Sequence, residues 1–185
     1  MSGVSGGGGG GGRVLIQSAD ATGVAAVEFL DFVDTKKYSS YELEFFTGSR
    51  GAATYNYFYM QLSGDAAAPV WIGGGYYDVG TRNNWGVNSG SEQAGYNNAG
   101  QWTILDRGTW PNGIARNLVH LNFGDRPTFR SKGHSYYEDG AAWAMESEHG
   151  FLDSAAAIKS LKIYLSGGPN WPSGTFKMFG ISGEN

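Results

Sequence analysis

Regular alternation of apolar and polar side chains is the clearest pattern along the chain. In residues 41–45 a tyrosine, a leucine and a phenylalanine alternate with two glutamates. In residues 116–123 apolar side chains recur at every second position from Val119 onward. A period of two places one set of side chains on each face of a β-strand, so both segments are predicted to be half-buried strands.

Other apolar and aromatic runs predict further strands, separated by stretches rich in Gly, Pro, Asn and Asp. Residues 141–148 contain the helix-favouring residues Ala, Met and Glu, but the segment is short and lies between strand candidates, so a helix is the less favoured alternative. No repeat of fixed length is present, which disfavours solenoids and propellers. The pattern predicts an all-β antiparallel sandwich or barrel. The further strands are expected at residues 14–17, 24–32, 55–62, 70–72, 101–105, 135–138, 158–165 and 174–181.

Composition supports this fold class. The 185 residues are the length of one domain, with 31 glycines, 15% aromatic residues and only 16% charged residues. Aromatic side chains suit a pleated sheet, and glycine disfavours helices. The absence of cysteine excludes disulfides and thiolate metal sites, and we expect neither a metal nor a cofactor.

Charge and hydropathy argue against several classes of partner. The net charge is −4 and the chain has no basic run that could follow a phosphate backbone, so nucleic-acid binding is not expected. No apolar run reaches the ~20 residues that span a bilayer, and the N-terminus lacks the pattern of a secretory signal peptide. We therefore expect no membrane insertion, synthesis in a cytoplasm, and release by another route, such as assembly into a particle freed by lysis.

An unbroken glycine run near the N-terminus separates residues 1–13 from the predicted sandwich of residues 14–185. Such a run has no side chains to bury and by itself is a flexible coil. It is either a tethering linker or a segment held by a neighbouring subunit, because glycine lets backbones approach closely. The candidate anchor residues are Gly6, Gly7, Gly8, Gly9, Gly10, Gly11 and Gly12.

Three stretches of the chain follow one another in a distinctive order. The first is the apolar strand Val27-Glu28-Phe29-Leu30, and the second is the tyrosine-rich strand at residues 38–43. The third is the closing strand Ser173-Gly174-Thr175-Phe176, which ends in Gly180-Ile181. Together they resemble a family of small bacteriophage tail-fibre or virion-surface structural proteins.

The resemblance implies a jelly-roll-like antiparallel β-sandwich that forms a homotrimer at the periphery of a virion. It covers the first third of the chain and about the last thirty residues, whereas residues 64–117 match nothing in the family. Met178 and Phe179 stand where leucine and tyrosine are usual, and both keep the closing strand apolar. Alternation along this strand places Phe176 in the core. The resemblance leaves a head and a tail location equally open.

The histidines suggest no catalytic or metal site. The sequence has no Gly-x-Ser-x-Gly nucleophile elbow between a strand and a helix, and no partner motif lies beside any histidine. His120 is interpreted as a surface or interface residue on the polar face of its strand, and His134 as part of a turn. Residues 146–149 combine glutamates with His149, but their spacing fits no standard zinc site, so we interpret them as solvated loop charge.

One pair of carboxylates has a spacing of interest. Glu42 and Glu44 lie about 7 Å apart on one face of their strand, which is within the range that glycoside hydrolases use. Alternation alone accounts for both, because they occupy the solvent side of a half-buried strand. We therefore predict that the protein is not an enzyme, and polysaccharide hydrolysis is the rejected alternative.

The middle of the chain has the composition of a recognition surface. Aromatic and amide side chains separated by Gly and Ser offer stacking faces for sugar rings and hydrogen bonds for hydroxyl groups. Packing and subunit interfaces are the competing explanation for the large aromatic residues, and we assign Trp71 and Trp102 to the core. The candidate ligand-binding residues, expected in loops, are Asn83, Asn84, Trp85, Tyr96 and Trp110.

The sequence thus predicts a non-enzymatic structural protein on the surface of a phage virion. Its N-terminal arm would attach a peripheral fibre, tail-tip or capsid-decoration domain to other virion proteins. The alternative is a lectin-like receptor-binding module that recognises a host surface glycan, and one protein can fulfil both roles.

Overall fold

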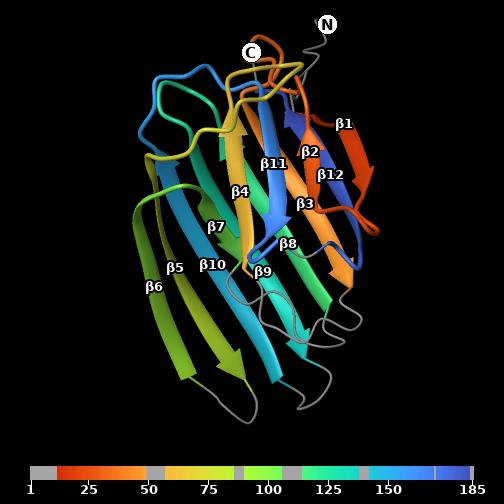
Figure 1. Ribbon diagram of the computed structural model, residues 1–185, viewed down its shortest axis with the longest axis vertical. Coiled ribbons are helices and arrows are strands. Elements are labelled where there is room, and N and C mark those ends of the chain that lie inside the picture. The colour runs from red at the N-terminus through yellow and green to blue at the C-terminus, as the bar shows by residue number, and fades with distance from the viewer. Residues whose placement is uncertain are drawn as a thin grey trace, which may run out of the picture.

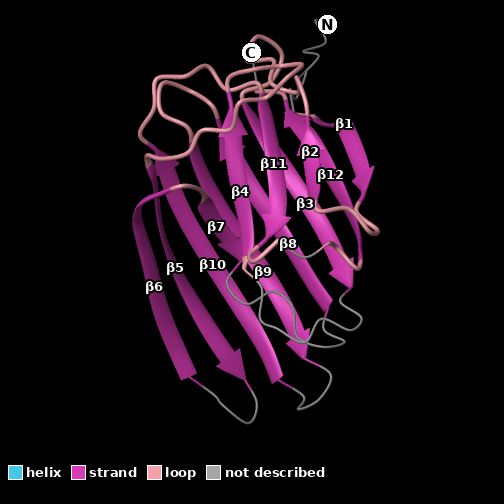
Figure 2. Cartoon of the chain, viewed as in Figure 1, coloured by secondary structure: helices cyan, strands magenta, loops and turns pink. Residues whose placement is uncertain are grey.

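The computed structural model describes residues 12–48, 57–85, 90–105, 114–137, 142–168 and 170–183. Regular secondary structure in this part of the chain is entirely β-strand (Figure 1, Figure 2), and it contains no helix that could cross a membrane. The strands are β1 (Arg13–Asp20), β2 (Ala26–Phe29), β3 (Ser40–Gly48), β4 (Phe58–Ser63), β5 (Tyr76–Trp85), β6 (Gly90–Ala99), β7 (Trp102–Leu105), β8 (Ile114–Asn122), β9 (Thr128–Tyr137), β10 (Ala142–Leu152), β11 (Ser160–Leu165) and β12 (Ser173–Ile181).

Two antiparallel sheets pack face to face. The larger has eight strands in the order β1-β12-β3-β8-β9-β10-β5-β6, and the smaller has four in the order β2-β11-β4-β7. In Figure 1 the smaller sheet lies in front of the larger one and nearer the end at which both termini are marked. The predicted all-β sandwich is confirmed.

The strand order contains a jelly roll with two additions. The hairpins β5–β6 and β9–β10 pair with each other through β5 and β10, and β9 joins them to β8. Without these hairpins, the sheets read β1-β12-β3-β8 and β2-β11-β4-β7. In this arrangement successive strands alternate between the sheets, except for β4 and β7, which pair with each other, and the first strand pairs with the last, as in a jelly roll. The added hairpins therefore widen one sheet beyond the area of its partner.

The core fills the space between the sheets and is strongly aromatic. Phe45 and Phe176 stack with ring centroids 5.1 Å apart, and Phe58 stacks on Trp171 at the same separation. Phe176 is fully buried, as the closing-strand pattern predicted, and so is Trp102. Face-to-face sheets bury every second side chain of each strand. This is why the alternation of apolar and polar residues in the sequence predicted the strands.

The segment 70–72 is not a strand, which corrects the sequence prediction. It lies in the long connection that carries the chain from β4 in one sheet to β5 in the other. Trp71 is partly exposed rather than in the core, and Lys162 Nζ lies 4.8 Å from the centroid of its ring. Ile72 N–H donates to Leu62 O of β4 at 2.9 Å, but the pairing does not continue, because three consecutive glycines follow at residues 73–75 and Gly75 turns the chain with a φ of 84°.

Residues 76–85 and 90–99 form strands where the sequence predicted recognition loops. β5 is paired on both sides, by β10 and by β6, so backbone hydrogen bonds outweigh the weak strand preference of its Gly and Asn residues. The same reason makes residues 142–152 a strand rather than a helix. His134 lies inside β9, so its assignment to a turn is also corrected.

The two ends of the sandwich differ. Gly12 N–H donates to Ser182 Oγ at 2.8 Å, and Ser182 N–H donates to Gly12 O at 3.1 Å, which joins the start of β1 to the end of β12. The remaining candidate anchor residues, Gly6–Gly11, lie outside the described residues. β5 and β9 end, and β6 and β10 begin, at the opposite end of the molecule (Figure 1).

Candidate functional site

The face of the eight-stranded sheet that points away from the smaller sheet, called here the outer face, carries the most unusual chemistry of the molecule. Cross-strand register fixes which residues share it, because directly opposed residues lie on one face. His120 is opposite Glu42 on one side and Arg130 on the other, and Arg130 is opposite His149. One row of the outer face thus reads Glu42, His120, Arg130, His149 across four strands.

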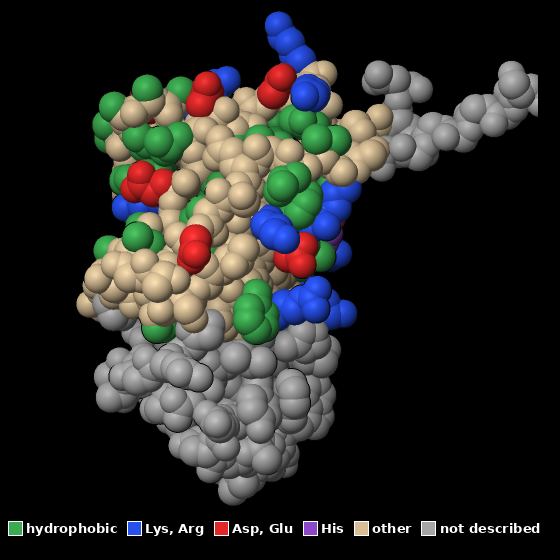
Figure 3. All heavy atoms as spheres, turned by 90° about the vertical axis from the view of Figure 1, so that its right-hand side faces the viewer, with side chains coloured by type: hydrophobic (Ala, Val, Ile, Leu, Met, Phe, Trp, Pro, Cys, Tyr) green, Lys and Arg blue, Asp and Glu red, His purple; other side chains and the backbone are tan. Residues whose placement is uncertain are grey.

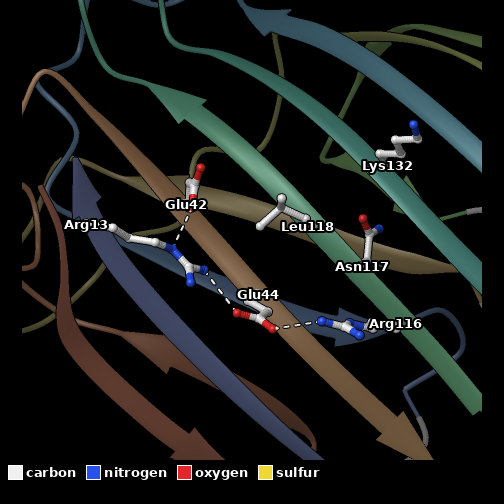
Figure 4. Close-up of a pocket in the computed structure, with 7 residues that line it drawn as sticks. All are labelled: Arg13, Glu42, Glu44, Arg116, Asn117, Leu118 and Lys132. Atoms are coloured by element: carbon white, nitrogen blue, oxygen red, sulfur yellow. Dashed lines mark hydrogen bonds and ion pairs between the residues drawn. The ribbon is translucent and has the colours of Figure 1, made fainter. Parts of the chain in front are cut away.

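The part of the outer face over β3 is a network of paired charges (Figure 4). Arg13 Nε lies 2.7 Å from Glu42 Oε2, and Arg13 Nη2 lies 3.0 Å from Glu44 Oε2. Arg116 Nη2 approaches Glu44 Oε1 at 3.5 Å, and His120 Nδ1 lies 3.2 Å from Glu42 Oε1. Both carboxylates that invited comparison with a hydrolase are therefore held by cations.

The Arg13 guanidinium organises this network. It extends from β1 over β12, with its Cζ 3.5 Å from the ring centroid of Phe179, before it reaches the glutamates. Its hydrogen bond to Glu44, together with the positive charge of the guanidinium, lowers the pKa of that carboxyl below its ordinary value. A depression of about 570 Å³ lies beside the network, with Leu118 and Lys132 also on its wall.

The part of the outer face over β9 carries the cations Arg130 and Lys132, with His120 of β8 and His149 of β10 beside them. His120, Arg130, Lys132 and His149 surround a second depression, of about 790 Å³, and all four are exposed. Among the described residues, Arg130 and Lys132 make no ion pair. We call these four residues the cationic strip. In Figure 3 the outer face is at the right of the picture, and Lys and Arg side chains are visible along that margin.

The distribution of charge over β8, β9 and β10 is one-sided. Glu148 of β10 has the opposite parity from His149 and is buried, whereas the outer-face positions of these three described strands include no Asp or Glu. His134 of β9 is opposite Arg116 of β8. His120 and His149 are both exposed on the outer face.

Three aromatic residues are paired across neighbouring strands at the end of the larger sheet that is remote from Gly12. In the register, Trp85 is opposite Trp143, and Trp143 is opposite Tyr136. We call these three residues the aromatic row. They occupy three adjacent strands, β5, β10 and β9.

The structure places four of the ligand-binding candidates that the sequence suggested in strands. Asn83, Asn84 and Trp85 are consecutive residues of β5, which pairs with β10. Tyr96 belongs to β6 and is opposite Asp78 of β5. Trp110 lies outside the described residues. The four described candidates therefore belong to the added hairpin β5–β6 and not to loops.

Sequence reasoning missed Arg130 and Lys132. A signal was present, because residues 128–132 alternate Thr, Phe, Arg, Ser and Lys, which is the period of a strand with one buried face. The segment 146–149 was likewise assigned to a loop. It is part of β10, where alternation directs Glu148 inward and His149 outward.

The described residues contain no group of His, Cys, Asp and Glu side chains arranged to hold a metal. Neither the protein-family models nor the curated proteins compared with the chain include a match. The outer face itself offers fixed cations, imidazoles, hydroxyl groups and aromatic rings on an open sheet surface.

Proposed function

We propose that the protein is a non-enzymatic structural component of a bacteriophage particle, positioned at its periphery and attached through residues 1–13. The jelly-roll frame and the closing-strand motif at residues 173–181 support this proposal, since both agree with the virion-surface proteins that the sequence resembles. The proposal applies equally to a fibre, a tail tip and a capsid decoration.

The observation that carries the proposal is the polarity of the sandwich. Hydrogen bonds between Gly12 and Ser182 tie the end of the glycine-rich arm to one end of the larger sheet. The aromatic row is at the opposite end, and the cationic strip lies along the strands between them. An arm at one end and a recognition surface away from it suit a domain that projects from a larger body.

Recognition of a host surface glycan is the second candidate function, and it is compatible with the first. The observation that favours it is the group of exposed polar and charged side chains on the outer face, which includes Asn122, Thr128, Arg130 and Lys132. Hydroxyl, amide and charged side chains bond the polar groups of a sugar.

Attachment is tested on particles purified by density gradient from a lysate of cells that carry the coding sequence. Peptides of the chain should be present in a fixed ratio to the major capsid protein, and a chain lacking residues 1–12 should be lost from otherwise intact particles. Absence of the full chain from the particles would overturn the proposal. Retention of the truncated chain would overturn the assignment of the arm as the attachment element.

A further inference from the structure

We propose that the cationic strip binds an anionic polysaccharide, one whose sugar units carry carboxylate or sulfate groups. This inference rests on the recognition role proposed above and is independent of attachment to a particle. It assigns the ligand class, the strands that bind it and the side chains that provide the charge.

The two parts of the outer face differ in how their charged side chains are paired. Over β3, both Arg13 and Arg116 are paired with glutamates of the protein itself. Over β9, Arg130 and Lys132 have no ion pair within the described residues. They lie two positions apart on one face of a single strand, about 7 Å from each other, so each raises the electrostatic energy of the other unless an anion lies between them.

Neighbouring strands place imidazoles beside these two cations. Arg130 is opposite His120 on β8 and His149 on β10, and the titratable group facing His120 from β3 is Glu42, at 3.2 Å. Glu42 is itself paired with Arg13. Arg130 and Lys132 therefore form a local concentration of positive charge on a chain whose net charge is −4.

The strip lies partly on strands that are added to the jelly roll. It extends from β8 onto β9 and β10, and β9–β10 is one of the two added hairpins. The added strands contribute Tyr76, Phe129 and Leu152 to the core through their inner face. Their outer face is not covered by the smaller sheet, so packing of the core does not determine its composition, which is open to a functional explanation.

The chemistry of the surroundings selects a polysaccharide as the ligand. Ser147 borders the same depression, and exposed Asn122 and Thr128 line the adjoining depression, so hydroxyl and amide groups surround the cations. The Arg130 guanidinium can bond a carboxylate or sulfate with two parallel hydrogen bonds.

Other polyanions fit this surface less well. A stable protein interface needs an apolar centre, and the exposed residues around the strip are polar. Nucleic acid demands many phosphate contacts, and the overall negative charge of the chain opposes a polymer of that charge density. An anionic glycan needs only a few fixed charges among hydroxyl-bonding groups.

The experiment is titration calorimetry of the full chain with polygalacturonate, with dextran sulfate and, as an uncharged reference, with dextran. The test variant is Arg130→Gln combined with Lys132→Gln. The matched control is Lys36→Gln combined with Lys37→Gln, which removes the same charge from exposed residues of the connection between β2 and β3. Melting temperatures of both variants establish that they are folded.

We expect at least one of the two anionic polymers to bind and dextran not to bind. The test variant should bind about 10-fold more weakly or worse, and the control should stay within about 2-fold. Preference for polygalacturonate identifies carboxylate as the ligand group, and preference for dextran sulfate identifies sulfate. Binding of neither polymer, or equal losses in the two variants, would overturn the inference. A chain that is present in particles yet binds neither polymer would refute this inference alone.

Discussion

Asn117 and Ser131 meet at one backbone carbonyl of the opposite sheet. Asn117 Nδ2 donates to Ile104 O at 2.8 Å and to Ser131 Oγ at 2.9 Å, and Ser131 Oγ donates to the same carbonyl at 2.5 Å. Both side chains are buried and belong to β8 and β9, whereas Ile104 belongs to β7. A polar contact thus joins the two sheets where the added strands begin.

Asn117→Ala should destabilise the protein by about 2–3 kcal/mol, because it deprives a buried carbonyl and a buried hydroxyl of a partner. Denaturant unfolding followed by tryptophan fluorescence measures the change. Asn170→Ala is the control, since Asn170 is exposed and should change the free energy of unfolding by no more than about 0.5 kcal/mol. Equal stability of the two variants would show that the contact between the sheets contributes nothing.

Phe176→Ala should lower the free energy of unfolding by about 3–5 kcal/mol, because the ring is fully buried and stacks against Phe45. Thermal unfolding monitored by circular dichroism is the measurement. Phe46→Ala is the matched control from β3, since that ring is 52% exposed and should be replaced at little cost. An unchanged melting temperature for Phe176→Ala would contradict the position of the last strand.

Stability should fall in strong alkali through Tyr76. Burial raises the pKa of Tyr76 to about 12 from an ordinary value of 10.0, so the folded state retains a proton that the unfolded chain loses. This contribution is complete below about pH 10 and is lost as the pH rises toward 12. In the Tyr76→Phe variant the free energy of unfolding should fall less steeply between pH 10 and about pH 12.

The same substitution also carries a cost at neutral pH. Leu62 N–H donates to Tyr76 Oη at 2.8 Å inside the core. Loss of this hydrogen bond should lower the free energy of unfolding by about 1–3 kcal/mol. The pKa of Tyr164 is also raised to about 12, so the stability of the Tyr76→Phe variant should still fall in part at high pH. An alkaline transition identical to that of the unaltered protein would contradict the role of Tyr76.

Acid should weaken the network around Arg13. The pKa of Glu44 is lowered from 4.5 by the hydrogen bond from Arg13, so its contribution to stability is complete above that value and is lost as the pH falls through the lowered pKa. Glu44→Gln should therefore reduce the acid dependence of the melting temperature below about pH 4.5. Glu28→Gln, at an exposed position of β2, should leave that dependence in place.

The homotrimer remains a prediction, and light scattering tests it. Val14 and Leu15 are 44% and 52% exposed on β1, an edge strand that directly follows the glycine-rich arm, which provides an apolar surface for subunit contact. The full chain should have the mass of a trimer at micromolar concentration, and a chain lacking residues 1–12 should dissociate more readily. A monomeric full chain would contradict the prediction.

Sequence patterns located the jelly-roll strands because burial on one face leaves a period of two. Leu43 and Phe176, for example, are both fully buried at positions that alternation assigned to the core. β5 and β6 escaped prediction because their Asn and Gly residues have weak strand preferences, and pairing with β10 supplies what local preference does not.

The candidate site was less predictable for a different reason. His120, Arg130 and His149 lie in three strands, and only the register between those strands brings them into one row. A shift of one residue in any strand would have sent its members to the core face. Sequence alone does not specify that register, so each histidine was interpreted in isolation.

The attachment of β1 has a mechanical consequence. β1 starts beside Gly12 and runs toward the opposite end, paired with β12 from Arg13 opposite Ile181 to Asp20 opposite Thr175. Because antiparallel hydrogen bonds lie perpendicular to the strands, a pull on the arm away from the domain drags β1 along its own axis. The bonds of this ladder then share the load in shear instead of breaking one after another like a zipper. Tension on the arm should therefore detach β1 from β12 only slowly.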